Sequence, residues 1–395
     1  MSLRVALIGY GFMGAAHSVG WRQAPAVFDL PDDVEMAVIV GRNGPAVAEA
    51  AAKWGWAESA TDWREVIARD DIDIVDIVTP GDSHAEIAIA ALEAGKHVLC
   101  EKPLANSVEQ AERMAEAARV AAERGVFATV GFTYRRVPAV TLFRDLIAAG
   151  KVGKVQQVRA AYRQDWLVDP EMPLAWRLQK EHAGSGALGD IGAHIIDMTQ
   201  FVTGQTVDAV SGVVETIVKR RPLQGEGSGL SGTAAEGYGE VTVDDVALFA
   251  GRLSNGALVS FEATRFATGR KNALTLEVSG DEGSLVFDLE DLNVLGFYDR
   301  TAPEQLQGFT KILVTEGVHP YISAWWPAGH ILGYEHGFVH QAKDVVEGIA
   351  KGVAAHPTFE EGLTVQKVLA AVEKSSAEQS RWVATEAAVG TPADN

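Results

Sequence analysis

Two polar side chains in one short run of this sequence have the types and the spacing that proton transfer requires. Asp190 and His194 are four residues apart, so on a helix their side chains share one face. Gly192, between them, costs roughly 0.5–1 kcal/mol in a helix, which suggests that something approaches closely there. A histidine beside a carboxylate is a good general base near neutral pH. Asp190 and His194 are therefore candidate catalytic residues.

Lys102 lies in a second setting that suits chemistry. It follows an apolar stretch that is typical of a strand, and Pro103 restricts it to extended backbone conformations. In open parallel sheets, ligands bind beyond the carboxyl ends of the strands, and this backbone would aim the ammonium group into that crevice. The segment Thr79–His84 follows another predicted strand and belongs to the same edge. A surface lysine in a salt bridge is the plainer alternative for Lys102.

A glycine-rich loop runs from Gly9 to Gly14, with the G-x-G-x-x-G spacing directly between a predicted strand and a predicted helix. Gly9 permits the tight turn, Gly11 lets the backbone approach a pyrophosphate, and Gly14 lets the helix pack closely on the sheet. The helix amino end, with Phe12 and Met13, offers unpaired N–H groups to phosphates. This context predicts a dinucleotide-binding site.

The end of the second predicted strand bears on the choice of dinucleotide. An acidic residue there would bind the adenosine ribose hydroxyls and select NAD. This sequence has Gly41 and Arg42 instead, so nothing repels a 2′-phosphate and Arg42 could pair with one. The cofactor is thus NAD(P), with a weak preference for NADP. An arginine in water is an equally good interpretation of Arg42.

The first third of the chain alternates strands with helices, which predicts an α/β fold with a doubly wound parallel sheet, a Rossmann domain over residues 1–130. Ser83 is expected to cap one helix, and Ser107 with Gln110 to cap another. The expected strands are Leu3–Ile8, Val34–Val40, Ile72–Val78, His97–Glu101 and Val126–Val130; the expected helices are Ala46–Trp54, Trp63–Arg69, His84–Ala94 and a long one ending at Arg124.

After about residue 150 the pattern changes to successive strands joined by turns, so residues 131–384 are expected to form an α+β domain with a large, mostly antiparallel sheet and helices on one face. The Gly- and Ser-rich segment 222–240 is read as a surface loop or, alternatively, a lid, and 385–395 as a disordered tail. The expected strands are Val155–Trp166, Val207–Arg220, Val241–Leu253, Ala257–Thr264, Ala273–Ser279 and Ser284–Leu289; the helices are Gly189–Thr203, His336–Ala350 and Glu360–Ser376.

The composition excludes several other classes of protein. The 395 residues carry a formal net charge of −19, and an acidic surface repels nucleic-acid backbones. The single cysteine, Cys100, can form no intrachain disulfide. No uncharged apolar stretch is long enough for a membrane span. We expect a cytoplasmic enzyme that binds neither nucleic acid nor membrane.

Together, these motifs resemble the Gfo/Idh/MocA family of oxidoreductases over nearly the entire chain. The resemblance implies that Lys102 polarises the reacting hydroxyl, that Asp190 binds and orients the substrate, and that His194 is the general base. It also implies that the Lys102–Pro103 bond is cis, and that the protein is a homodimer or homotetramer through the second sheet. The motifs outside the catalytic trio that carry the resemblance are Gly9–Gly14 with His17, Thr79-Pro80 with His84, and Glu101. Among them, Thr79, Pro80, His84 and Glu101 are expected to bind the cofactor together with the glycine loop. Gly81-Asp82 departs from the family's usual asparagine.

Within the family, the sequence is most similar to pyranoside dehydrogenases of the levoglucosan dehydrogenase type, on the segment around Gln164 and Trp166. A sugar ring offers an apolar face on which Trp166 could stack and hydroxyls that need a partner such as Gln164. Tyr134 and Tyr334 are further candidates for hydroxyl contacts. For each aromatic residue, ordinary packing is an equal alternative.

The predicted function is hydride transfer between NAD(P) and a secondary hydroxyl, or the matching ketone, of a sugar, anhydrosugar or cyclic polyol. Two alternatives remain: a glycoside hydrolase that uses tightly bound NAD through transient oxidation, and a non-catalytic nucleotide sensor. A sensor would have no need for Lys102, Asp190 and His194. His336 and His340 have the spacing of a zinc helix, but Gly337 stands where a metalloprotease has glutamate, so no metal is expected.

Overall fold

The computed structural model describes residues 2–225 and 233–385, and the chain divides into two compact units. The first unit comprises Met1–Leu142 and Leu313–Leu363, and the second comprises Phe143–Ile312 and Thr364–Asn395. Residues 313–363 therefore return to the first unit, which a single boundary at residue 130 does not describe. In the described part of the chain, no helix is long and apolar enough to cross a membrane.

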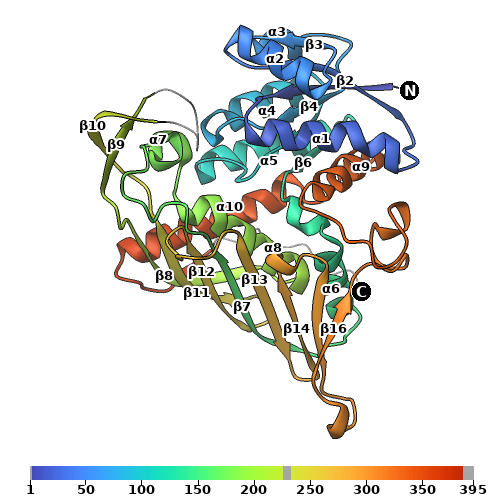
Figure 1. The fold of residues 1–395 in the computed structure, drawn as a ribbon, viewed down its shortest axis with the longest axis vertical. Helices are drawn as coiled ribbons and strands as arrows, with labels where there is room; N and C mark the ends of the chain where they lie inside the picture. Colours follow the sequence, from blue (N-terminus) through green and yellow to red (C-terminus); the bar gives the residue numbers. More distant parts are fainter. Residues whose placement is uncertain (1, 226–232, 386–395) are drawn as a thin grey trace. The chain divides into compact units, whose positions relative to one another are not determined.

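The first unit is built on a six-stranded sheet in the order β3-β2-β1-β4-β5-β6, with all neighbouring strands parallel (Figure 1). This confirms the expected Rossmann sheet. Its strands are β1 (Ser2–Ile8), β2 (Asp33–Val40), β3 (Glu58–Ala60), β4 (Ile74–Ile77), β5 (His97–Cys100) and β6 (Ala128–Val130). Its helices are α1 (Phe12–Val27), α2 (Gly44–Trp54), α3 (Trp63–Ile67), α4 (His84–Glu93), α5 (Val108–Ala122) and α9 (His336–Lys351), with α6 (Pro138–Ala148) crossing into the second unit.

Burial of apolar side chains on both faces explains this sheet. The four residues of β4 are all buried, as a central parallel strand requires. Helix α9 packs on α1, and Val339 and Val346 of α9 share a core with Trp21 of α1. The late segment 313–363 is therefore part of the Rossmann core, because α9 covers apolar surface that α1 would otherwise expose.

Of the three side chains expected to cap helices, only Ser107 does so in the expected way. The Ser107 side chain accepts from the backbone N–H of Gln110, at the start of α5. The Gln110 amide oxygen instead accepts from the N–H of Asn106, one residue before the position that a capping box uses. Ser83 was wrongly expected to cap α4: its hydroxyl donates back to Thr79 and to the carbonyl of the following proline, because a short 3₁₀ turn precedes the helix.

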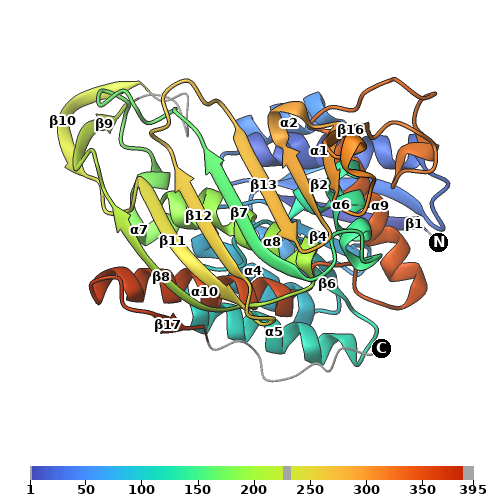
Figure 2. The ribbon, with the colours of Figure 1, turned by 90° about the horizontal axis from the view of Figure 1, so that it is seen from below.

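The second unit contains a nine-stranded sheet in the order β16-β15-β14-β13-β7-β12-β11-β8-β17. Strands β7 and β12 are parallel, and β7–β13, β11–β12 and β8–β11 are antiparallel, which confirms the mostly antiparallel sheet. Helix α8 (Ala193–Thr203) packs on one face (Figure 2). The strands are β7 (Val155–Arg163), β8 (Val207–Glu215), β11 (Val246–Leu253), β12 (Leu258–Thr264), β13 (Ala273–Gly280), β14 (Gly283–Asp288), β15 (Val294–Asp299), β16 (Phe309–Leu313) and β17 (Val383–Ala384). The remaining helices are α7 (Lys180–Ala183) and α10 (Phe359–Ala377), which begins in the first unit.

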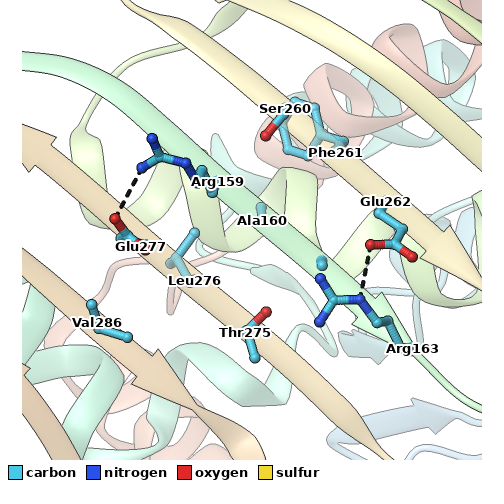
Figure 3. A pocket seen from close by; sticks show the side chains of 11 residues that line it. Arg159, Ala160, Arg163, Ser260, Phe261, Glu262, Thr275, Leu276, Glu277 and Val286 are labelled. Atoms are coloured by element: carbon cyan, nitrogen blue, oxygen red, sulfur yellow. Dashed lines mark hydrogen bonds and ion pairs between the residues drawn. The ribbon is translucent and has the colours of Figure 1, made fainter. Parts of the chain in front are cut away.

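The opposite face of this sheet has no helix in the described part of the chain. A shallow depression on it is lined by side chains of β7, β12, β13 and β14 (Figure 3). Two ion pairs cross neighbouring strands there, Arg159 with Glu277 at 2.9 Å and Arg163 with Glu262 at 2.8 Å. Exposed cross-strand ion pairs of this kind stabilise a sheet by less than about 1 kcal/mol each.

The segment 222–240 is more regular than expected. Strands β9 (Arg220–Gln224) and β10 (Ala234–Glu240) pair antiparallel in a separate two-stranded sheet. Residues 226–232 lie outside the described residues, so the interpretation of that part as a lid is not tested. Thr385 is buried and its N–H donates to the carbonyl of Asp208, so the chain is still ordered there, while 386–395 lie outside the described residues.

Candidate active site

The glycine loop has the geometry that its spacing predicts. Gly9 has φ = +114°, and a Cβ there would lie 2.9 Å from Val78. A Cβ on Gly14 would lie 2.6 Å from the carbonyl oxygen of Gly9, whereas one on Gly11 would meet nothing within 4 Å. Two of the glycines are thus required by packing, and the third faces open space at the amino end of α1. No side chain in residues 2–225 or 233–385 caps that end, so its N–H groups suit a pyrophosphate.

The side chains around the second strand end leave Arg42 available for a ligand. The Tyr10 ring lies against Gly41, where any Cβ would collide with it. Asn43 is occupied, because its side-chain oxygen accepts from Ala46 N–H and so caps α2. Arg42 is exposed and makes no ion pair or hydrogen bond with any residue that the structure describes. Phe12, at 68% exposure, is the most exposed large apolar residue of the loop.

A buried histidine joins the ends of β4 and β5. The His84 ring nitrogens lie 2.9 Å from the carbonyl oxygen of Thr79 and 3.1 Å from that of Pro103. Burial lowers the pKa of His84 below its usual value. This residue therefore lies between the loop after Thr79 and the loop that contains Lys102, and it contacts both. Lys102 itself is partly buried and its bond to Pro103 is cis.

Behind these loops lies a cluster of buried charged groups that sequence reasoning missed. His17 of α1 places Nδ1 at 2.8 Å from Asp76 Oδ2 and Nε2 at 3.0 Å from Glu101 Oε1. Trp21 Nε1 donates to the same Asp76 oxygen at 2.7 Å. Burial alone would lower the pKa of His17, but the two carboxylates raise it to about 10. His17 is thus an imidazolium ion held between two carboxylates.

Asp190 and His194 lie on one continuous helical stretch, as expected. A π-helical turn spans Leu188–Gly192 and runs directly into α8. Asp244 fixes the start of this stretch, because its carboxylate accepts from the N–H groups of Gly186 and Leu188, both at 2.7 Å. Burial raises the pKa of Asp244, and the two hydrogen bonds from Gly186 and Leu188 partly offset this rise. Such a π turn is frequent at functional sites.

Two arginines that sequence reasoning did not assign surround Asp190. Arg265 is 1% exposed and donates to Asp190 Oδ2 at 2.9 Å and to the Gly186 carbonyl at 3.1 Å. Its guanidinium lies over the Trp166 ring, 5.1 Å from the centroid, which adds a cation–π contact. Burial lowers the pKa of Arg177, and attraction to Asp190 opposes that shift. The Asp190 carboxylate therefore lies in the field of two cations.

Aromatic and amide side chains at the end of β7 and the start of β13 form one connected wall. Trp166 donates to Gln164, Gln164 donates to Asn272, and Tyr162 donates to the same Asn272 oxygen, at 2.9, 2.8 and 2.7 Å. The Tyr162 ring meets the His194 ring edge-on, with centroids 5.9 Å apart. The structure thus brings Gln164 and Trp166 together with the two catalytic candidates of the second unit.

The two tyrosines expected to contact substrate lie together in the first unit. Their rings meet edge-on with centroids 6.4 Å apart, Tyr134 being buried and Tyr334 being 41% exposed. Tyr334 also contacts Phe338, which in turn contacts the His17 ring. Only Tyr334 of this pair therefore presents much of its surface to a ligand.

The two histidines with zinc-helix spacing are used in packing. His340 Nε2 accepts from Trp325, and Nδ1 lies 2.8 Å from the carbonyl oxygen of Arg136. Burial lowers the pKa of His340 to about 4, so the ring is neutral. Throughout residues 2–225 and 233–385, no three His, Cys, Asp or Glu side chains gather in a way that could hold a metal ion.

Each of the two units contains a segment that matches a known protein family. Residues 3–132 match the model of the oxidoreductase family with the NAD-binding Rossmann fold, and residues 140–286 match the GFO/IDH/MocA C-terminal domain. Levoglucosan dehydrogenase of Pseudarthrobacter phenanthrenivorans is 42% identical over 97% of this chain and 98% of its own length.

Two solved structures have the same fold as this chain over almost their entire length. An oxidoreductase domain protein from Kribbella flavida has 58% identity and a TM-score of 0.93, covering 98% of this chain and 99% of its own. Levoglucosan dehydrogenase in complex with NADH and levoglucosan has 40% identity and a TM-score of 0.91, covering 98% and 100%. This chain belongs to the Gfo/Idh/MocA family of NAD(P)-dependent oxidoreductases.

Proposed function

We propose that this protein oxidises a secondary hydroxyl of a sugar, anhydrosugar or cyclic polyol with NAD(P), or reduces the matching ketone. The observation that carries the proposal is the wall of the second unit, where amide and aromatic side chains adjoin the helix bearing Asp190 and His194. Such a mixture of ring faces and polar groups suits a sugar ring. A relative that this chain matches along nearly its full length is named levoglucosan dehydrogenase.

The proposed catalytic roles are those that the family resemblance implies, and the chemistry of the side chains supports them. We assign Lys102 to the hydroxyl oxygen, which its ammonium group would polarise, and His194 to the hydroxyl proton, which its imidazole would accept during oxidation. Asp190, held by Arg265, would orient the substrate beside His194. The nicotinamide of the bound dinucleotide supplies the site that takes or returns hydride. In the reverse direction, His194 returns the proton as the ketone becomes an alcohol.

The dinucleotide would be held by the first unit. Gly9, Gly11 and Gly14 shape the loop, and Phe12 and Met13 begin the helix whose amino end would face the pyrophosphate. The residues assigned to the remaining cofactor contacts are Gly41, Arg42, Thr79, Pro80, His84 and Glu101. Of these, His84 and Glu101 act through the loops that they fix, because both side chains are buried and bonded within the protein.

Substrate oxidation can be tested directly. Purified enzyme, incubated with levoglucosan, scyllo-inositol and related polyols and with each dinucleotide, is expected to form one reduced nicotinamide per ketone, measured by absorbance and by product analysis. Release of sugar from a glycoside without net reduction, or binding without turnover, would contradict a dehydrogenase. Lys102→Ala and His194→Ala should each lower kcat by about 100- to 10,000-fold. Lys154→Ala, which removes an exposed lysine far along the chain, is the matched control.

We further propose a preference for NADP over NAD, on the basis of Arg42. This arginine is exposed and unpaired among the described residues, and no carboxylate ends β2 to repel a 2′-phosphate. Arg42→Ala should raise the KM for NADP by about tenfold, as expected for the loss of one charge-assisted contact, and leave the KM for NAD unchanged. Arg119→Ala, on the exposed face of α5, is the control. Equal effects on both dinucleotides would remove Arg42 from cofactor selection.

We also propose that the helix-free face of the nine-stranded sheet forms a homodimer or homotetramer interface. Leu248 and Leu258 are nearly half exposed there, on neighbouring strands. Leu248→Glu should lower the mass measured by light scattering to that of a monomer. An unchanged mass would show that the chain assembles elsewhere, and a monomeric wild-type protein would contradict the interface altogether.

A further inference from the structure

Three hydrogen bonds link four side chains into a single chain at one end of β7 and β13. Trp166 Nε1 donates to Gln164 Oε1, Gln164 Nε2 donates to Asn272 Oδ1, and Tyr162 Oη donates to the same Asn272 oxygen. Asn272 directly precedes β13, whose first residue pairs with the last residue of β7. Strand pairing therefore brings these four residues together although Gln164 and Asn272 are 108 positions apart.

The polarity of this chain of bonds is fixed from one end. An indole N–H can only donate, so Gln164 must turn its carbonyl oxygen toward Trp166. Its NH₂ group then faces Asn272, which must offer its own carbonyl oxygen in return. The Tyr162 hydroxyl donates to that oxygen as well. The donor-only Trp166 therefore determines the orientation of both amides.

One consequence concerns the other half of the Asn272 amide. Its oxygen accepts two bonds within the wall, while its NH₂ group has no hydrogen-bond partner among residues 2–225 and 233–385. Asn272 is partly exposed, so these N–H groups are open to a ligand. Tyr162, bonded to the other side of the amide, contacts the ring of His194. Two unused donors therefore lie one side chain away from the candidate general base.

We propose that Asn272 is a specificity-determining residue that donates to an oxygen of the sugar close to the carbon being oxidised. An NH₂ group selects hydroxyl, ring or carbonyl oxygens, which a polyol supplies, and a site built to bond one oxygen discriminates against an analogue that lacks it. Gln164 has its oxygen bonded to Trp166 and one N–H bonded to Asn272, so at most one N–H remains for substrate. This inference rests on the proposed sugar dehydrogenase function.

Asn272→Asp is the sharpest variant. An aspartate of the same shape still accepts from Tyr162 and Gln164, so the wall is preserved, but its outward atom changes from donor to acceptor. We expect the KM for levoglucosan to rise by at least about tenfold with the KM for the dinucleotide unchanged. Because aspartate also adds a charge near His194, the neutral Asn272→Ala variant must raise the KM in the same direction.

Asn255→Asp is the matched control. Asn255, in the turn between β11 and β12, also accepts a backbone N–H with its oxygen and donates to a carbonyl with its nitrogen. This variant makes the same chemical change in the same sheet at a turn, and its kinetic constants should equal those of the wild type. A tenfold rise in the KM of Asn255→Asp would show that an added negative charge in this sheet is enough to cause the effect seen with Asn272→Asp.

Deoxy derivatives of levoglucosan, each lacking one hydroxyl, locate the bond. One derivative should lose at least about tenfold in kcat/KM with the wild type and lose nothing further with Asn272→Ala. If the wild type oxidises a sugar and Asn272→Asp has the same KM for it, Asn272 has no role in specificity, whereas the proposed dehydrogenase function is still supported. Failure of the wild type either to bind or to oxidise levoglucosan and related polyols would overturn both.

Discussion

Two clusters of buried charge, one in each unit, show how differently the protein uses ionised groups. In the first unit, the side chains of His17, Asp76 and Glu101 are 1%, 0% and 6% exposed, and both ring nitrogens of His17 bond to carboxylates. In the second, the Asp190 side chain is 31% exposed, and Nε and Nη1 of the buried Arg265 have no hydrogen-bond partner among the residues that the structure describes. The first cluster is closed and the second is open.

This difference indicates that the closed cluster stabilises the fold and that the open cluster is suited to binding a ligand. Removing ions from water costs several kcal/mol each, and a protein recovers that cost only when the remaining hydrogen bonds are made. The closed cluster makes them, and so clamps α1 to the ends of β4 and β5. The open cluster leaves donors unused and a carboxylate within reach of a ligand, which is the condition expected of a binding site.

The largest expected effect is on stability, from His17→Gln. A neutral amide cannot balance Asp76 and Glu101, and breaking a buried ion pair costs about 3–5 kcal/mol. We expect that loss in the free energy of unfolding, measured by denaturant titration. A loss below about 1 kcal/mol would contradict the imidazolium ion. His84→Gln, at a buried histidine bonded only to backbone carbonyls, is the control and should cost less.

The wild-type protein gives a second test of the closed cluster, through pH. The pKa of His17 rises from 6.5 in the unfolded chain to about 10 in the fold. Its stabilising contribution is therefore complete below pH 6.5 and is lost as the pH rises toward 10. In that window the free energy of unfolding should fall by up to about 1.4 kcal/mol per pH unit. His17→Gln should lack this slope, and parallel curves would contradict the shift.

The next effect tests the open cluster, through Arg265→Lys. Lysine keeps the charge but cannot hold Asp190 and the Gly186 carbonyl together while lying flat on Trp166. We expect kcat/KM to fall by about 30-fold, equivalent to about 2 kcal/mol for one charged hydrogen bond.

Arg221→Lys is the matched control for that variant. Arg221 is as buried as Arg265, but within the described part of the chain its guanidinium donates only to the backbone carbonyls of Leu167 and Asp169. Its replacement should lower stability by about 1–2 kcal/mol and change kcat/KM by less than about threefold. Equal kinetic losses in the two variants would show that a buried arginine matters there only for folding.

The sequence predicts the strands and helices around the closed cluster, although not the cluster itself, better than it predicts the side chains that surround Asp190 in the open cluster. Strand β1, the glycine loop and the start of α1 are adjacent in the chain, so their spacing carries the signal. The His17 cluster also left a trace: Asp76 interrupts an otherwise apolar central strand, and a charge there needs a partner. The three-residue strand β3 and the return of 313–363 to the first unit leave no local pattern.

The open half depends on contacts between distant parts of the chain. Arg265 and Asp190 are 75 positions apart, and Tyr162 and Asn272 are 110 apart. Nothing local marks Arg265 or Asn272, because each gains its meaning only when β7 pairs with β12 and β13. Sequence reasoning found the catalytic candidates on the helix and missed the residues that surround them. It predicted Gln164 as a partner for a sugar hydroxyl, and it did not predict the bonds of Gln164 to Trp166 and Asn272.

The smallest expected effect comes from Trp21→Phe, which removes one donor from the closed cluster. Trp21 Nε1 donates to Asp76 at 2.7 Å, and a hydrogen bond to a charged group contributes about 1.5–3 kcal/mol. Trp56→Phe removes an equivalent buried indole donor whose acceptor, Ser18, is neutral. Denaturant unfolding should show a loss about 1 kcal/mol greater for Trp21→Phe.

Kinetics decide what that difference means. If the closed cluster is framework, Trp21→Phe should leave kcat and both KM values within about twofold of the wild type, because His17 still holds both carboxylates. A fall in kcat without a loss of stability would show that the Asp76 charge reaches the reacting atoms. In that case the first cluster would belong with the second, and burial alone would not distinguish a framework ion from a catalytic one.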